Sequence, residues 1–315
     1  MNKITVIGSG NVGSTIAYTL TVQGIASEII MIDLNQEKSL GEALDIRQGV
    51  SFCSPATVYA GNYEDAAGSD IVVITSGMAR KPGQSRLDLA QANVNIIKSI
   101  ADKIVPVCPE ATYVIVSNPV DILTYVFLKH TGLPQERVIG SGTVLDTARL
   151  RSRISEYYSV NQKNVHAYVL GEHGDSSFVP WSLANISNVP VETFKDALQT
   201  KDDYPEFVLD EVEEYMRKSG ARVIQRKGAT FYAVSISVCH ICKCLLSGID
   251  TTLTVSTLLN GEYGIDDVCL STLAVVGSDG IKARVPAELT EEEIGKLQHS
   301  AQCLRNVIDQ IKFEN

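Results

Sequence analysis

A histidine, a carboxylate and a guanidinium stand in two motifs that could together move a proton beside a bound carboxylate. His173 stands in Gly-Glu-His-Gly-Asp, and Asp146 and Arg149 lie three residues apart, on one face of a predicted helix. A histidine with a near-neutral pKa can take the proton of a hydroxyl group and return it in the reverse direction. Asp146 could fix the histidine tautomer and stabilise the imidazolium, while Arg149 could grip a carboxylate with two hydrogen bonds.

Three further polar residues could meet the same substrate. Arg80 and Arg86 flank the polar stretch Lys-Pro-Gly-Gln-Ser, and Asn118 follows an apolar run in Ser-Asn-Pro-Val-Asp. A cation such as Arg86, delivered by a closing loop, would stabilise charge on a carbonyl oxygen and exclude water. Taken singly, all of these residues also fit ordinary roles, namely a turn histidine, a helix ion pair, solvated loop charges and an Asn-Pro turn.

The first 33 residues predict a dinucleotide site. The motif GSGNVG, residues 8–13, follows an apolar run, opens a helix and precedes Asp33 at the end of the next apolar run. Gly8 permits the tight turn, Gly10 lets a pyrophosphate approach the backbone, and Gly13 lets helix and strand pack closely. Asp33 can accept hydrogen bonds from ribose hydroxyls and would repel a 2′-phosphate, which favours NAD over NADP. A glycine-rich turn without a ligand is the alternative.

These two sets of residues fit one reaction, the oxidation of a small 2-hydroxy acid by NAD. The cofactor would take a hydride from C2 while His173 removes the hydroxyl proton. Arg149 would hold the acid's carboxylate, and Arg86 would stabilise charge on the C2 oxygen.

The elements that must position these residues differ between the two halves of the chain. In the first half, apolar runs alternate with helical patterns, which is typical of a doubly wound parallel sheet of the Rossmann type, covered on both faces. We predict strands at 3–7, 28–34, 70–75 and 112–117, another starting at 138, and a helix over 86–105 that Pro106 ends.

The second half predicts an α+β catalytic domain with antiparallel strands. It combines an acidic helix after Pro205, a final helix opened by a capping box of Thr290 and Glu293, and turn signals at 260–264. Other expected elements are helices over 144–158 and 231–246 and strands at 165–170, 252–259 and 268–276. No low-complexity linker separates the halves, so we divide the chain into a NAD-binding domain, residues 1–142, and a catalytic domain, residues 143–315.

Composition restricts the partners and the compartment. The 315 residues are 44% hydrophobic and 20% charged, with a formal net charge of −10. An acidic chain argues against nucleic acid or an anionic membrane as the main partner. No apolar run approaches the ~18 residues that span a bilayer, and the N-terminus lacks the features of a signal peptide. Seven scattered cysteines indicate reduced thiols in a cytoplasmic protein.

Two other classes of protein share some of these features. Cys239 and Cys242 form a C-x-x-C pair, but they lie in an apolar segment without a second pair at zinc spacing, so we expect core cysteines and no metal. A non-catalytic NAD sensor would keep the glycines and Asp33. It would have no need of the histidine, the carboxylate and the two arginines together.

Along essentially its whole length, the chain resembles the L-lactate/L-malate dehydrogenase family. The matching motifs are the glycine motif, SNPVD (117–121), GSGTVLDTARLR (140–151), GEHGDSSFVPWS (171–182) and KGATFYAVS (227–235). The resemblance implies His173 as acid/base, Asp146 as its partner, Arg149 as carboxylate clamp and Arg86 as carbonyl polariser. It also implies that Asn118 and Thr230 line the substrate site.

The resemblance further implies the cofactor contacts and the assembly. A homo-oligomer, with a tetramer preferred to a dimer, and a place in fermentative glycolysis follow from it. Arg151 and His166 occupy the positions where bacterial lactate dehydrogenases hold fructose 1,6-bisphosphate between subunits; a surface arginine and a strand histidine are the plain alternative. Besides the three glycines, residues where the family touches NAD are Val12, Asp33, Lys38, Tyr63, Gly77, Met78, Ser99, Val116, Asn118 and Ser141.

The substrate loop departs from the lactate pattern. Lactate enzymes usually carry Gln at its substrate-reading position, in a stretch like QKPGE, whereas this chain has RKPGQ at 80–84. Malate enzymes of the family carry an arginine at this position, where it meets the second carboxylate of the substrate. Arg80 could bind malate or oxaloacetate in the same way. The other motifs, including GEHGD and Thr230, resemble bacterial L-lactate dehydrogenases. L-lactate dehydrogenase is therefore the prediction and L-malate dehydrogenase the alternative.

Overall fold

A single nine-stranded sheet runs through both halves of the protein. The computed structural model describes residues 2–78, 86–198, 204 and 206–313. The strand order is β12-β11-β10-β6-β5-β4-β1-β2-β3. The strands are β1 (Lys3–Ile7), β2 (Glu28–Ile32), β3 (Thr57–Ala60), β4 (Ile71–Ile74), β5 (Thr112–Ile115), β6 (Val138–Gly140), β10 (Thr251–Asn260), β11 (Asp266–Gly277) and β12 (Gly280–Arg284).

The sheet changes character at one junction. Strands β1 to β6 are parallel, whereas β10, β11 and β12 are antiparallel, and β10 joins β6 through the single pair Ser256 and Gly140. The fold class predicted from the sequence is therefore confirmed. The sequence did not predict that the antiparallel strands of the second half extend the parallel sheet of the first half.

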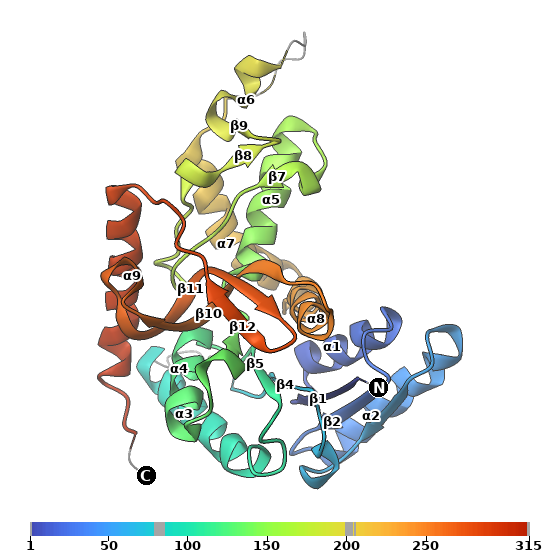
Figure 1. Cartoon of the computed structure of the whole chain (residues 1–315). Coiled ribbons are helices and arrows are strands. Elements are labelled where there is room, and N and C mark those ends of the chain that lie inside the picture. Colours follow the sequence, from blue (N-terminus) through green and yellow to red (C-terminus); the bar gives the residue numbers. More distant parts are fainter. Residues whose placement is uncertain (1, 79–85, 199–203, 205, 314–315) are drawn as a thin grey trace.

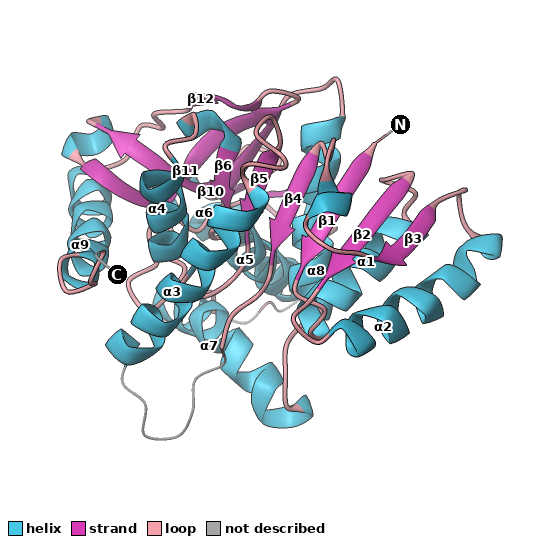
Figure 2. Cartoon of the chain, turned by 90° about the horizontal axis from the view of Figure 1, so that it is seen from below, coloured by secondary structure: helices cyan, strands magenta, loops and turns pink. Residues whose placement is uncertain are grey.

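Helices cover both faces of the sheet, as the continuous apolar strands require. On one face lie α3 (Arg86–Ile104), α4 (Val120–Thr131) and α9 (Glu291–Ile308). On the other lie α1 (Asn11–Val22), α2 (Gln36–Gly49) and α8 (Tyr232–Leu246). Figure 2 shows the strands of the large sheet side by side, with β3 at one edge. Each face has its own core, and β1, β4 and β5 contribute to both because alternate side chains point in opposite directions.

A smaller lobe stands on one end of the sheet and carries part of the candidate catalytic residues (Figure 1). It contains α5 (Val144–Tyr158), α6 (Val191–Ala197) and α7 (Leu209–Lys227), and a three-stranded sheet of β7 (Val165–His166), β8 (Asn185–Ile186) and β9 (Val189–Pro190). Its core is separate from the other two. Short 3-10 turns complete the described chain at η1 (Val50–Phe52), η2 (Glu64–Ala66), η3 (Gln135–Arg137), η4 (Gln162–Asn164), η5 (Trp181–Leu183) and η6 (Glu262–Gly264).

Most predicted elements are confirmed, although the strands predicted at 28–34 and 112–117 each end two residues earlier, and the one at 165–170 is much shorter. Helix α5 covers the predicted range, and α9 begins with the expected capping box of Thr290 and Glu293. The strand predicted at 165–170 is wrong beyond residue 166, because its partner β8 is only two residues long. The chain then leaves that small sheet, and Gly171 forms an isolated bridge with Ser271 of β11. Among the described residues, none of the helices has the length and apolar character needed to cross a membrane.

Candidate active site

The turn between β1 and α1 has the geometry of a pyrophosphate site. Gly8 has φ +104°, in the region that favours glycine. A Cβ on Gly13 would lie 1.7 Å from the Gly8 carbonyl oxygen, so only glycine allows this close packing. A Cβ on Gly10 would meet nothing within 4 Å, so the backbone there faces open space. The N-cap residue of α1 is Gly10, which has no side chain to bond the N–H groups of the first turn. Such N–H groups at a helix start are suited to bind an anion.

Asp33 joins this turn to the adenosine side of the site. Its Oδ2 accepts a hydrogen bond of 2.6 Å from the Ser9 backbone N–H, and its Oδ1 accepts one of 2.8 Å from the Asn35 N–H. The carboxylate is therefore held at the end of β2, with lone pairs left for ribose hydroxyls. Asp33, Tyr63 and Ser99 line one cavity of about 300 Å³ together with apolar side chains of β1, β2 and α3. These residues fit an adenosine moiety, since such sites are mostly apolar with few placed polar groups.

The other expected cofactor residues lie along the carboxyl edge of the parallel strands or beside it. Gly77 and Met78 follow β4, Val116 and Asn118 follow β5, and Ser141 follows β6. Ligands in doubly wound sheets bind at this edge. Val12 lies in the first turn of α1 and Lys38 in the first turn of α2, where the Lys38 backbone N–H donates to Asn35.

One residue that the sequence analysis missed ties two of these segments together. Asn93 of α3 is 2% exposed, and its Oδ1 accepts a hydrogen bond of 2.7 Å from the Met78 N–H. Its Nδ2 donates a bond of 2.7 Å to the Asn118 carbonyl oxygen. The signal was available, because Asn93 is a polar residue on the apolar face of the helix predicted over 86–105.

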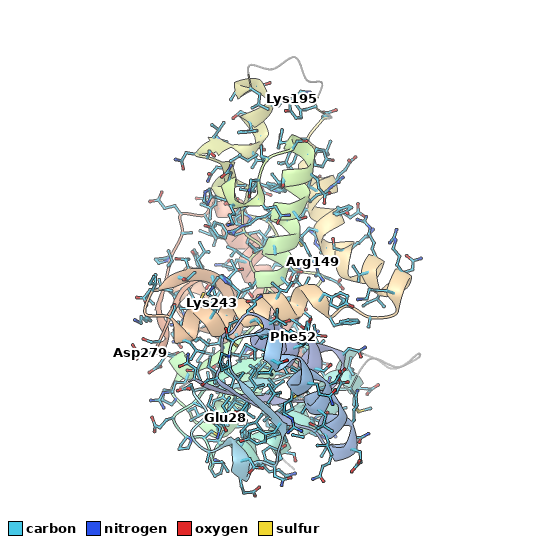
Figure 3. The ribbon with its side chains drawn as sticks, turned by 90° about the vertical axis from the view of Figure 1, so that its right-hand side faces the viewer. Glu28, Phe52, Arg149, Lys195, Lys243 and Asp279 are labelled. Carbon is cyan, nitrogen blue, oxygen red and sulfur yellow. The ribbon has the colours of Figure 1, made fainter. Side chains whose placement is uncertain are left out.

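Two of the predicted catalytic residues, His173 and Arg149, converge on the carboxylate of a third, Asp146. Nδ1 of His173 lies 2.5 Å from Oδ2 of Asp146, and Nη1 of Arg149 donates a bond of 2.8 Å to the other oxygen, Oδ1. Asp146 is only 6% exposed. Figure 3 shows Arg149 on α5, in the part of the helix close to α8. The helix predicted from the sequence thus brings the carboxylate and the guanidinium together, and the chain reversal after residue 170 brings in the histidine.

The electrostatics of this group suit acid–base chemistry. Burial by itself would raise the pKa of Asp146, but the charges and hydrogen bonds of His173 and Arg149 outweigh it and lower that pKa. Burial would lower the pKa of His173, but the Asp146 carboxylate outweighs burial and raises that pKa. The carboxylate is therefore ionised at neutral pH, and it fixes Nδ1–H of the imidazole as the donor. In the described part of the chain, nothing bonds to Nε2, which can face a substrate.

The loop that carries His173 is anchored at three points. Its Gly171 exchanges backbone hydrogen bonds of 2.9 and 3.0 Å with Ser271 of β11. The Glu172 N–H donates a bond of 2.8 Å to Oγ of Ser300, which is fully buried in α9. The His173 N–H donates a bond of 2.8 Å to Oδ2 of Asp121, in the first turn of α4. Because α4 begins just after β5, the last bond ties the histidine to the sheet edge that holds the dinucleotide turn.

The structure describes only some of the remaining candidates. Thr230 is half-buried between α7 and α8. Arg80 lies outside the described residues; Arg86 is the first residue of α3, and its side chain lies outside them too. Arg151 donates to the Ala167 carbonyl oxygen from 3.0 Å, which places it beside the segment that carries His166 on β7.

The cysteine pair is part of the core. Cys239 and Cys242 are fully buried in α8, on the sheet face shared with α1, and burial raises the pKa of both thiols. Buried thiols in apolar surroundings are inert. No group of three or more metal-ligating side chains occurs among the residues that the structure describes.

Comparison with known proteins agrees with this arrangement in both halves. The family model of the lactate/malate dehydrogenase NAD-binding domain matches residues 2–140, and that of the lactate/malate dehydrogenase alpha/beta C-terminal domain matches residues 143–314. The chain belongs to the lactate/malate dehydrogenase family. It is therefore an NAD-dependent oxidoreductase, and the residues around Gly10 and Asp33 fit the dinucleotide that this family uses.

Similar proteins are found over the full length. The chain is 45% identical over 313 residues to an L-lactate dehydrogenase of Thermoanaerobacter sp. (strain X514), covering 99% of each chain. It is 45% identical over 309 residues to one of Clostridium botulinum (strain Hall), covering 98% of this chain and 96% of the relative.

Solved structures of lactate dehydrogenases also superimpose on this fold. The minor L-lactate dehydrogenase from Enterococcus mundtii superimposes with a TM-score of 0.94 at 36% identity, over 99% of both chains. A lactate dehydrogenase from a Medee basin deep-sea metagenome library gives 0.93 at 38% identity, over 98% of both chains. These relatives favour the predicted lactate activity over the malate alternative.

Proposed function

We propose that this protein is an NAD-dependent L-lactate dehydrogenase that interconverts pyruvate and L-lactate. The observation that carries the proposal is the group formed by His173, Asp146 and Arg149, tied through Asp121 to the sheet edge of the dinucleotide turn. NAD supplies the hydride chemistry when bound, in the reverse reaction as NADH. Regeneration of NAD from NADH fits the fermentative role that we expect. We keep residues 1–142 and 143–315 as the cofactor and catalytic parts.

The chain's own residues would handle the proton and the carboxylate. In pyruvate reduction, the protonated His173 donates from Nε2 to the C2 oxygen, while Asp146 holds Nδ1–H and stabilises the imidazolium. Arg149 binds the substrate carboxylate with the guanidinium N–H groups that Asp146 leaves free. We assign Arg86 to the C2 oxygen, and Asn118 and Thr230 to the walls of the substrate site, as the sequence predicted.

A kinetic comparison of pyruvate and oxaloacetate tests the proposal. We expect purified protein to oxidise NADH with pyruvate at a higher kcat/KM than with oxaloacetate. No oxidation with either substrate would refute the enzyme and support a non-catalytic NAD sensor; a preference for oxaloacetate would instead refute only the lactate assignment.

The substitution Arg80→Gln sharpens this comparison. A guanidinium that meets a second carboxylate contributes about 1.5–3 kcal/mol, so its removal should shift the ratio of the two kcat/KM values toward pyruvate by about ten- to a hundredfold. An unchanged ratio would show that Arg80 does not read the substrate. Arg86 is not a suitable control, because we place it in the active site.

We also propose that the protein acts as a homo-oligomer, with a tetramer expected. A groove of about 670 Å³ between α5 and α7 is lined by Arg149, Arg153, Arg222 and Arg226. Phe52 is 91% exposed on the face that also bears α8, as Figure 3 shows. Leu40, Tyr232 and Ile236 are exposed as well. A second copy could cover these apolar side chains. Light scattering that shows a stable monomer would refute this.

Fructose 1,6-bisphosphate is our proposed effector. A cavity of about 420 Å³ beside α5 is lined by Arg151, Lys163 and His240, and His166 lies one residue from the carbonyl that Arg151 binds. Cations repeated across a two-fold axis would suit a bisphosphate. We expect the effector to raise the apparent affinity for pyruvate, and Arg151→Gln to abolish that response. A pyruvate saturation curve that does not change with effector would contradict the proposal.

We place the reaction in the cytoplasm, on the basis of the seven cysteine thiols. All seven are free in the structure.

A further inference from the structure

The first helix of the chain and the helix that follows Thr230 meet in a buried seam. Helix α8 lies beside α1, and the two helices share one core (Figure 1). The Ser235 hydroxyl of α8 donates to the Val12 carbonyl oxygen of α1 at 3.2 Å. One turn further along both helices, the Cys239 thiol donates to the Ile16 carbonyl oxygen at 3.6 Å. Both donor side chains are fully buried, and they join the cofactor part of the protein to the catalytic part.

The Ser235 hydroxyl has a second acceptor, which belongs to the substrate side. The Phe231 carbonyl oxygen lies 2.6 Å from Oγ of Ser235. Phe231 is the N-cap residue of α8 and directly follows Thr230. A hydroxyl has a single proton, so two carbonyls share it. One of them lies in the first turn of the dinucleotide helix, and the other lies next to the wall that we assign to the substrate site.

The backbone does not need this hydroxyl for its own hydrogen bonding. The Val12 oxygen lies in α1, where it can accept the N–H of the residue four positions later. The Phe231 oxygen already accepts the Ser235 backbone N–H at 3.1 Å. An alanine at position 235 would favour the helix more than a serine does. What the hydroxyl adds is therefore a link between α1 and the start of α8.

We propose that Ser235 is a positioning residue that couples cofactor binding to substrate binding. The inference rests on the proposed function, in which Val12 contacts NAD and Thr230 lines the substrate site. When the dinucleotide turn is occupied, α1 is fixed, and the shared hydroxyl then holds the start of α8 and the adjacent Thr230 in place for the substrate. Coupling between two binding sites is reciprocal, so a bound substrate analogue must also tighten the binding of the cofactor.

The test compares Ser235→Ala with Ser237→Ala as matched control. Ser237 is also buried in α8, and its hydroxyl donates at 2.8 Å to the Val234 carbonyl oxygen of the same helix. Each change removes one buried hydroxyl, but among the described contacts only Ser235→Ala removes a bond to α1. Ser237 lines the cavity that we assign to the effector, so the measurements contain no fructose 1,6-bisphosphate. Melting temperatures verify that both variants fold.

The first measurement is the binding of NADH without turnover. NADH is titrated by fluorescence without and with saturating oxamate, in which an amino group replaces the methyl group of pyruvate. The coupling factor is the ratio of the two dissociation constants. In Ser235→Ala this factor should fall by about two- to tenfold, the range of one net hydrogen bond, and in Ser237→Ala it should stay at the wild-type value. An unchanged factor in Ser235→Ala, or an equal fall in both variants, would overturn the proposal.

Steady-state kinetics separate positioning from a general loss of structure. Ser235→Ala leaves the group of His173, Asp146 and Arg149 intact. At saturating NADH, the KM for pyruvate should therefore rise by about two- to tenfold, while kcat changes by less than about twofold. A fall in kcat at an unchanged KM would contradict the proposal.

A further variant decides the matter if Ser235→Ala does not fold. Cys239→Ala removes the other bond of the seam, which comes from a weaker donor, and should lower the coupling factor by a smaller amount. An unchanged factor in that variant would overturn the proposal. No oxidation of NADH by the wild type with pyruvate or oxaloacetate would refute the proposed function. An active wild type whose coupling factor survives Ser235→Ala would refute only the role of Ser235.

Discussion

The dinucleotide turn and the catalytic group are built from different parts of the chain, the first from backbone and the second from charged side chains. The turn is built from backbone, since Gly8, Gly10 and Gly13 contribute their conformations and their lack of side chains. The catalytic group is built from charges, with Asp146 bonded to both His173 and Arg149. The first site can bind an anion without changing protonation, and the second works only through protonation.

The difference teaches where each site is sensitive. A backbone site fails when added atoms block it, and its response to pH is weak. A site of coupled charges fails when one partner is lost, since that leaves another buried charge uncompensated. Changes made to one site at a time should therefore separate binding of the cofactor from the movement of the proton.

The largest effect should come from His173→Gln. Without an acid that donates to the C2 oxygen, kcat/KM for pyruvate should fall by about 10³–10⁴-fold, and the affinity for NADH should stay unchanged. Fluorescence titration of NADH together with steady-state kinetics checks this. Wild-type rates in the variant would contradict our mechanism, and a parallel loss of NADH affinity would show that the two sites are not separate.

A smaller but still large loss should follow Asp146→Asn. The amide can be held by Arg149, but it no longer stabilises the imidazolium or fixes Nδ1–H, so kcat should fall by about 10²–10³-fold. The alkaline limb of pyruvate reduction should also move to lower pH, because Asp146 is the chief group that raises the pKa of His173. A pH profile with unchanged midpoint would show that the 2.5 Å contact does not govern protonation.

Gly10→Ala and Gly13→Ala should break the dinucleotide turn in two ways. A methyl group on Gly10 meets no atom of the described residues within 4 Å and would fill the space that we assign to a phosphate. NADH should therefore bind about ten- to a hundredfold more weakly, with an unchanged melting temperature. A methyl group on Gly13 collides with the Gly8 carbonyl, so the melting temperature should drop as well. Equal melting temperatures for both variants would contradict this account.

The smallest effect should be on stability. The lowered pKa of Asp146 stabilises the fold above the ordinary Asp range, and that contribution is lost as the pH falls through the lowered value. The raised pKa of His173 stabilises the fold fully below its ordinary value near 6.5, and that contribution is lost as the pH rises through the raised value. His173→Gln should therefore melt a few degrees below wild type near pH 5–6. The difference between the two melting temperatures should be smaller at higher pH. A difference in melting temperature that calorimetry finds to be independent of pH would contradict the coupling between His173 and Asp146.

The sequence by itself determined the local elements and the chemistry of the site. The bounds of α5 and the capping box of α9 follow from periodicity and caps, which act over a few residues. The placement of Asp146 and Arg149 on one helical face follows from the same short-range geometry. The dinucleotide turn could also be predicted from the glycine motif, because its function depends on conformations that only glycine tolerates.

The tertiary structure decided which of these elements meet. Antiparallel strands of the second half joined the parallel sheet through Ser256 and Gly140, a contact between residues more than a hundred positions apart. His173 reached Asp146 because the chain left the small sheet after residue 166, since β8 offers only a short partner. The sequence showed Asn93 only as a polar residue on an apolar helix face, and its bond to the Asn118 carbonyl became visible only in the tertiary structure. Asp121 was missed because its importance lies in a buried hydrogen bond to distant backbone, and such a bond leaves no periodic signal in a single sequence.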